Sequence, residues 1–185
     1  MRMKAFRMTA VSAALALVAG SAWAGPVAND NELLLSGGFF HRDDSETGSV
    51  NLDLSFGHYF GNPAWQLGLQ QSLTWLIVDD AEDPWFAVTA PFVNYHFLNV
   101  TQENRVVPFV GAQLGLVWND DDATGVAGPQ GGAKFFVTDQ TFIQAKYRYE
   151  FFFDDFEQTD DNADDGNHVV SLGIGYVWGG SGNRL

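Results

Sequence analysis

The richest source of metal-ligating groups in the sequence is one acidic stretch, DDFEQTDDNADDGN (154–167). Carboxylate and amide oxygens are the ligands that calcium prefers in proteins. Asp160, Asn162 and Asp164 stand two residues apart, as ligands do in an EF-hand loop, but Gly166 comes one position too late for that loop. We therefore expect a mobile, solvated segment that binds divalent cations diffusely, in preference to an ordered calcium site.

A second group of charged and polar side chains lies within stretches whose residues alternate between polar and apolar. In TFIQAKYRYEFFF (141–153), charged and amide residues occupy one face, and apolar and aromatic residues occupy the other. Such alternation predicts a β-strand with one polar and one apolar side. The residues expected on this kind of polar face are Asp53, His96, Lys134, Lys146, Arg148 and Glu150.

The elements that must position these residues are strands. Eight stretches alternate with period two and are bounded by turn residues. No stretch longer than a single turn shows the apolar stripe of a helix. The predicted strands cover 32–41, 50–61, 65–78, 85–98, 107–119, 130–138, 141–153 and 168–178. Pro91 lies inside the fourth stretch and removes one ladder hydrogen bond, so we expect a bulge or a local widening there.

The connections between the predicted strands differ in chemistry. Those after odd-numbered strands, 42–49, 79–84, 119–129 and 154–167, hold 17 of the 23 acidic residues, whereas 61–64 and 138–140 are tight turns. In an up-and-down arrangement the four acidic connections emerge at one end. Short turns at one end and longer loops at the other are typical of transmembrane barrels. The sequence predicts an all-β, eight-stranded antiparallel up-and-down transmembrane β-barrel.

The faces of the strands indicate which solvent surrounds the barrel. In VVSLGIGYVW (169–178) one face is large and apolar, the other is small, and neither carries a charge. A soluble barrel or sandwich, which is the alternative, would expose charged residues on its water-facing side. We interpret the large face as lipid-facing and the small face as interior. Aromatic residues near strand ends are expected in interfacial girdles; they are Trp65, Trp75, Trp85, Trp118, Trp178, Tyr59, Tyr95 and Tyr176.

The first 24 residues have a basic start, an apolar run and a closing AWA, which is the pattern of a secretory signal peptide. An uncleaved inner-membrane anchor is the alternative, but the apolar run is shorter than the ~20 residues of a spanning helix. Removal of residues 1–24 changes the net charge from −14 to −17, which argues against nucleic acid as a partner. The absence of cysteine excludes a disulfide framework. We expect a barrel over 25–178 and a short tail over 179–185.

The sequence resembles the small eight-stranded outer-membrane β-barrel family of Gram-negative bacteria, the OmpA/OmpX-like architecture. The resemblance covers residues 25–178 and rests on VPFVGAQLGLVW, on GPQGGAKFFVTDQTFIQAKYRYEF and on the last strand. By that resemblance, Ser171, Gly173, Tyr176 and Trp178 match the family's assembly signal, which the outer-membrane insertion machinery reads. The tail GGSGNRL departs from the family's habit of ending on the aromatic residue.

Some barrels of this kind modify lipid A, and the resemblance would then imply a histidine and a serine two residues apart. The four histidines are followed at that spacing by Asp43, Phe60, Leu98 and Val170, so the pattern is absent. We therefore expect no enzymatic activity and no cofactor. His96 is interpreted as a satisfied interior residue.

These features predict an outer-membrane protein with a structural or surface-interaction role, exerted through four acidic loops. The expected partners are outer-membrane lipids and lipopolysaccharide, the insertion machinery, and divalent cations at the loops. The alternative is a porin-like, narrow channel for ions or small solutes along the polar interior. We favour a charge-paired plug over a channel, because eight strands leave an interior only wide enough for side chains to fill, and buried charges need partners.

Overall fold

The computed structural model of the protein describes residues 25–41, 47–78, 85–101, 104–119, 123–153 and 167–180. The predicted signal peptide (1–24) lies outside the described residues. So do the last five residues of the tail and, within the acidic connections, residues 42–46, 79–84, 120–122 and 154–166, which include the candidate calcium ligands at 160–164. Within the described ranges, no helix is long and apolar enough to cross a membrane.

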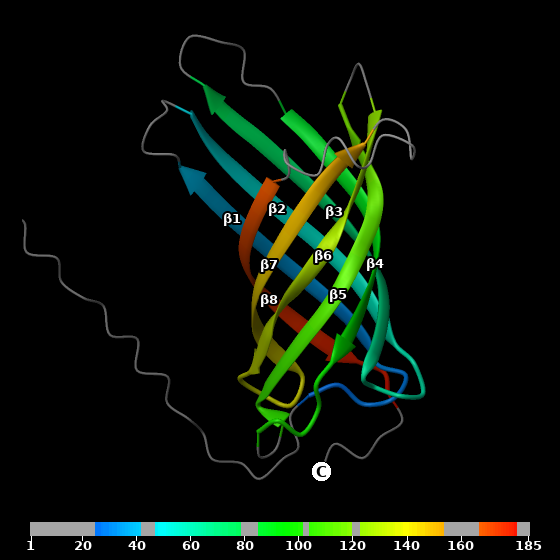
Figure 1. The fold of residues 1–185 in the computed structure, drawn as a ribbon. Helices are drawn as coiled ribbons and strands as arrows, with labels where there is room; N and C mark the ends of the chain where they lie inside the picture. The colour runs from blue at the N-terminus through cyan, green and yellow to red at the C-terminus, as the bar shows by residue number, and fades with distance from the viewer. Residues whose placement is uncertain are drawn as a thin grey trace, which may run out of the picture.

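Eight antiparallel strands close into a single barrel in the order of the chain, from β1 to β8 and back to β1 (Figure 1). The predicted fold class, an eight-stranded all-β barrel, is confirmed. The strands are β1 (Asn31–His41), β2 (Thr47–Tyr59), β3 (Trp65–Val78), β4 (Trp85–His96), β5 (Val106–Trp118), β6 (Ala123–Phe136), β7 (Thr141–Phe153) and β8 (Asn167–Trp178).

The two sides of the strands alternate between the interior and the outer surface. In β7, Lys146, Arg148 and Glu150 are buried, while Ile143 and Tyr147, at odd positions of the same strand, lie on the outer face. Successive side chains of a pleated strand point to opposite faces, so the period read from the sequence becomes an inside and an outside. The polar set lines the interior.

The outer surface is apolar around the whole barrel. Leucine, isoleucine, valine and aromatic side chains from every strand are exposed there, and the greatest exposure is on β8, where Val170, Leu172 and Ile174 have exposed fractions of 67%, 63% and 65%. Soluble monomers rarely expose contiguous apolar patches of more than a few hundred Å². The outward face of the barrel therefore suits a medium other than water.

Strand β6 is longer than predicted. It begins at Ala123, seven residues before the predicted start at 130, and pairs with β5 from Trp118↔Ala123 to Val106↔Phe135. The stretch ATGVAGP resembles a turn because it is rich in glycine and ends in proline. Here it is a strand of small residues, since the neighbouring strands approach it closely. At Gly128, a Cβ atom would collide with the carbonyl oxygen of Tyr149.

Two further expectations are wrong, one wholly and one in part. Tyr59 does not join an aromatic girdle: it is fully buried in the interior, in the same phase along β2 as Asp53. At Pro91 there is no bulge, because the register between β4 and β5 is the same on both sides, at Thr89↔Leu116 and at Phe92↔Gln113. The expected loss of ladder bonding is present: Ala90 and Pro91 are unpaired with β5, because proline lacks a donor, while pairing with β3 continues through Leu69.

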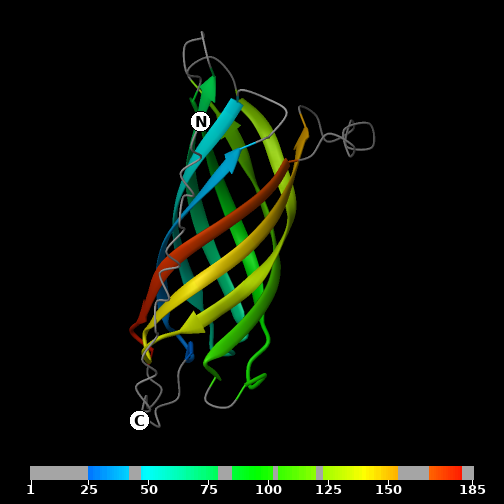
Figure 2. The same cartoon turned by 90° about the vertical axis from the view of Figure 1, so that its left-hand side faces the viewer.

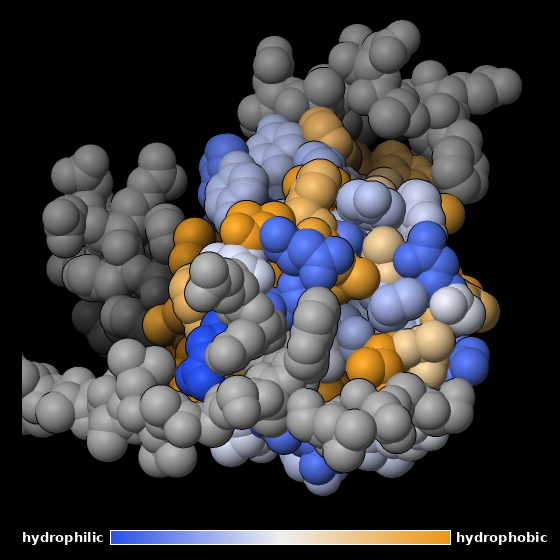
Figure 3. Space-filling view, turned by 90° about the horizontal axis from the view of Figure 1, so that it is seen from below, coloured by the Kyte–Doolittle hydropathy of each residue, from blue (hydrophilic) through white to orange (hydrophobic). Residues whose placement is uncertain are grey.

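The lower end of the barrel in Figure 1 carries the short connections and the two ends of the described chain. There Asp30, which is fully buried, accepts hydrogen bonds from the backbone of Val27 (2.8 Å) and of Gly180 (2.7 Å). This carboxylate joins the segment before β1 to the segment after β8. Figure 3 views this end from below and shows hydrophilic and hydrophobic residues intermixed across it.

Candidate functional site in the barrel interior

The interior of the barrel holds every residue of the predicted polar set. The six residues, all buried, are Asp53, His96, Lys134, Lys146, Arg148 and Glu150. The structure divides them between two clusters, with a belt of amides between. We call these the lower cluster, around Lys134 and His96, and the upper cluster, around Arg148, which also contains Asp53, Lys146 and Glu150.

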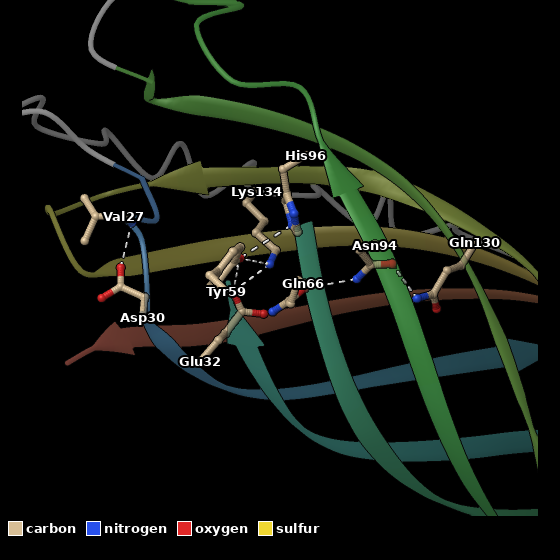
Figure 4. A network of polar contacts seen from close by, with 9 residues as sticks. All are labelled: Val27, Asp30, Glu32, Tyr59, Gln66, Asn94, His96, Gln130 and Lys134. Carbon is tan, nitrogen blue, oxygen red and sulfur yellow. Dashed lines mark hydrogen bonds and ion pairs between the residues drawn. The ribbon is translucent and has the colours of Figure 1, made fainter. Parts of the chain in front are cut away.

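The lower cluster is built around an ion pair between distant strands (Figure 4). The Lys134 Nζ atom on β6 lies 2.6 Å from Oε2 of Glu32 on β1 and donates a 2.7 Å hydrogen bond to the Tyr59 hydroxyl on β2. The same hydroxyl donates to Oε2 of Glu32 at 2.6 Å. Three groups thus satisfy one another with all three side chains out of contact with water.

Aromatic rings surround the ammonium group of this cluster. Lys134 Nζ lies 5.1 to 5.6 Å from the ring centres of Tyr59, Phe109 and Phe142, within the range of cation–π attraction. His96 packs against Tyr59 and Phe109, with its Nε2 atom 3.5 Å from the Tyr59 hydroxyl. Its Nδ1 atom is not aligned for a hydrogen bond with any described residue, although the ring interacts with the backbone of Ala64.

A belt of amide side chains lies next to the lower cluster. Asn94 on β4 donates to Oε1 of Gln66 on β3 (3.1 Å) and accepts from Nε2 of Gln130 on β6 (2.7 Å). Gln66 and Asn94 lie opposite each other on the neighbouring strands β3 and β4. The contact of Asn94 with Gln130 joins strands that are not neighbours, as Figure 4 shows. At this level the interior is therefore occupied by uncharged amide groups that are hydrogen-bonded to one another.

The upper cluster contains the remaining charges. Arg148 Nε lies 2.7 Å from Oε1 of Glu150, and its Nη1 lies 3.8 Å from Oδ2 of Asp53. Neither nitrogen is aligned for a hydrogen bond with any described residue. The guanidinium is therefore close enough to both carboxylates to form ion pairs, but its N–H groups do not point at their oxygens.

Lys146 is hydrogen-bonded to a further amide, that of Gln70, rather than to a carboxylate. Its Nζ atom donates to Oε1 of Gln70 at 2.6 Å, and Gln70 in turn donates to Ser72. Between the two clusters, the remaining space near Gln70, Asn94 and Lys146 is only about 10 Å³. That volume admits at most one water molecule, so the middle of the interior is filled.

The prediction of the interior residues left out two members of the lower cluster. Tyr59 had a usable signal, since it follows Asp53 and Ser55 at even spacing. Glu32 had a weaker one, because the three leucines that follow it, of which only Leu34 faces inward, hide the phase of the strand. Among the described residues, no group of three or more histidine, aspartate or glutamate side chains could hold a metal ion.

The residues of the family-type assembly signal lie on both sides of β8. Ser171 is buried, and Gly173 packs against Ser36 so closely that a Cβ atom would collide with it. Tyr176 is exposed on the outer face, and its ring stacks on that of Trp178 at a centroid distance of 6.2 Å. Small residues thus face the neighbouring strand, and aromatic residues face outward.

Comparison with known proteins gives matches of fold. No protein-family model matches the sequence, and no curated protein matches it either. Among solved structures, the N-terminal β-barrel domain of Pseudomonas aeruginosa OprF matches with a TM-score of 0.56 and 18% identity, over 83% of this chain and 100% of that domain. The Yersinia pestis outer membrane protein Ail, determined in a phospholipid bilayer nanodisc, matches with a TM-score of 0.50 and 14% identity, over 81% and 99%. The resemblance to small eight-stranded outer-membrane β-barrels is thereby confirmed at the level of the fold.

Proposed function

We propose that this protein is a non-enzymatic β-barrel of the outer membrane, which presents its acidic connections at the cell surface. The observation that carries the proposal is the continuous apolar outer face, which surrounds an interior filled with paired polar groups. In hydrocarbon, strands satisfy all their backbone donors and acceptors only in a closed sheet. A barrel in lipid needs an apolar outer face and can keep its polar side chains inside, whereas a barrel in water would expose its polar side chains.

The positions of aromatic residues on the outer face support the proposal that the barrel lies in a lipid bilayer. On β4, Trp85 and Tyr95 share the outer face ten residues apart; Trp85 packs against Trp118 (6.0 Å) and Tyr95 against Trp65 (5.1 Å). Ten residues at ~3.4 Å each, tilted by about 40°, span roughly 26 Å along the barrel axis. The apolar band of an outer-membrane barrel is about 25 Å tall, with aromatic girdles at both borders. The two aromatic pairs suit those borders.

The acidic connections supply the surface chemistry in this proposal. With β6 beginning at Ala123, the four connections after odd-numbered strands still contain 17 of the 23 acidic residues, and the strand order brings all four to one end. A surface of this charge favours cations. Divalent cations that bridge these carboxylates to lipopolysaccharide are the proposed partners. Insertion would use the outer-membrane machinery that reads β8, after export directed by residues 1–24.

A narrow channel is less well supported. The interior is filled between Lys146 and the amide belt, and the cations there are held by Gln70, Glu32 and Tyr59. An enzymatic role is also not favoured. The buried hydroxyls of Ser36 and Ser72 are bonded to Asp53 and Gln70, so neither is paired with a histidine base.

Gel electrophoresis of the mature chain from an outer-membrane fraction tests the membrane proposal. A closed barrel that resists detergent should migrate differently before and after boiling. A water-soluble protein with no heat shift would contradict it. For the loops, calorimetric titration of the folded protein with calcium should give weak heats that lose their divalent selectivity at high salt, and a flat trace would remove the cation-bridging part alone.

A further inference from the structure

The barrel is not paired over its full height where β1 meets β8. The pairs run from Asn31↔Trp178 to Gly37↔Leu172, although β1 continues to His41 along β2 and β8 extends back to Asn167 along β7. Figures 1 and 2 show the two strands separating toward the upper end. At Gly38 a Cβ atom would lie 2.6 Å from the carbonyl oxygen of Val170, so this carbonyl occupies the space over Gly38.

A cavity of about 370 Å³ lies behind this gap, and residues of both strands line it. This volume is within the ~300–1,000 Å³ range of small-molecule sites. Most of its wall is apolar and comes from Phe86, Val88, Val169 and Val170, with Gly38 on the side of β1. Unlike the filled middle of the barrel, this part of the interior has room for a ligand.

The polar part of the cavity lining comes from the upper cluster. Arg148 and Glu150 line it together with Asn51 and Thr74. Arg148 is 2% exposed, and its Nε and Nη1 atoms lie beside Glu150 and Asp53 without being aligned for a hydrogen bond with any described residue. Buried donors of this kind almost always have a partner. A ligand with a hydrogen-bonding group would provide one.

We propose that the cavity between β1 and β8 binds an uncharged single-chain amphiphile, which enters sideways from the bilayer with its chain against Phe86, Val88 and Val169 and its hydroxyl head against Arg148 and Glu150. The route rests on the proposed membrane function. It is supported by the outer face of β8 beside the gap, where Val170 and Leu172 are among the most exposed apolar residues. An acyl chain at that face meets an unpaired strand edge with an apolar cavity behind it.

The charges select the head group. Arg148 carries one positive charge, while Glu150 lies 2.7 Å and Asp53 3.8 Å from it. Lys146 belongs to the same cluster, so two cations balance two carboxylates there, and a charged head group would upset this balance. A hydroxyl adds no charge, and it can accept a hydrogen bond from Arg148 and donate one to Glu150 once these buried groups turn toward the cavity.

The test uses a dodecanol that carries a photoreactive diazirine at the end of its chain, added to the mature protein folded in phosphatidylcholine vesicles. After illumination, labelled peptides are mapped by mass spectrometry. We expect labels on the outward residues Leu172 and Ile174 and also on the cavity residues Phe86, Val88 and Val169. Labels on the outer face alone would overturn the cavity site while leaving the membrane proposal intact. No label on the outer face would contradict the membrane proposal itself.

Two neighbouring positions give a matched control. Ser49 lines the cavity, whereas Val50 points outward from the same strand. Ser49→Trp should abolish cavity labelling and Val50→Trp should keep it, with heat-modifiability reporting that each variant folds. If Ser49→Trp does not fold, Ser49→Leu should lower the cavity labelling at least twofold. Equal labelling in the folded Ser49 and Val50 variants would overturn the site.

Chain-matched probes test the head group. A photoreactive dodecanoate and a photoreactive dodecyltrimethylammonium should label the cavity at least fivefold less than the alcohol at pH 8. If the carboxylate labels the cavity as strongly as the alcohol, the neutral-head assignment is wrong.

Discussion

Lys134 and Glu32 are 102 residues apart in the sequence, yet their side chains form a 2.6 Å ion pair that joins β6 to β1 through the interior. Both side chains are almost completely buried. The two strands are not neighbours in the barrel, so the pair spans the space that an open pore would occupy. At the level of the lower cluster, this ion pair fills the interior of the barrel.

Removal of Lys134 alone should destabilise the barrel strongly. Lys134→Met leaves the Glu32 carboxylate buried without its cation, which costs about 3–5 kcal/mol. The double variant Glu32→Gln/Lys134→Met should recover most of the loss, because no charge is left unpaired. Urea unfolding in vesicles measures the free energies. If the two single changes simply add in the double variant, the pair is not coupled as the geometry implies.

The filled middle of the barrel predicts a closed conductance state. Planar bilayers with the unaltered protein should show no discrete current steps. The double variant Gln70→Ala/Lys146→Ala removes the side chains that are bonded across the interior at 2.6 Å, and it should produce small steps. Ser72→Ala, a small change in the same region, is the control and should stay closed. Discrete steps in the unaltered protein, reduced on replacing Lys146 or Arg148, would instead favour the channel alternative.

Close approach between strands makes some glycines irreplaceable and others tolerant. At Gly128 a Cβ atom would collide with the carbonyl oxygen of Tyr149, whereas at Gly131 the nearest atom, the carbonyl oxygen of Phe109, would be 3.4 Å away. Gly128→Ala should therefore cost about 1–3 kcal/mol through overpacking, and Gly131→Ala should be nearly neutral. Urea unfolding of the two variants decides the matter, and equal stabilities would contradict the close packing of β6 against β7.

Most of the fold could be predicted because charges and aromatic residues mark the phase of the strands. In β7, Lys146, Arg148 and Glu150 alternate with large apolar residues, and the strand lies at its predicted bounds. The first half of β6 could not be predicted, since glycine and alanine on both faces give no period. The partners inside the barrel also could not be predicted, because a contact such as Lys134 with Glu32 depends on the register of several strands.

Asp30 provides the last prediction, which concerns the tail after β8. Its two carboxylate oxygens accept hydrogen bonds from the backbone of Val27 and Gly180, so it connects the segments that flank the β1–β8 pair. Asp30→Ala removes both bonds and leaves two partly buried donors without partners. A fully buried donor left unpaired costs about 1–3 kcal/mol, so the loss per group should be at or below that range. Of these two bonds, a chain that ends at Trp178 loses that from Gly180 and keeps that from Val27, so it should be destabilised less. Unfolding in urea compares the two. Were the shortened chain as unstable as the Asp30 variant, the tail would contribute through contacts other than this carboxylate.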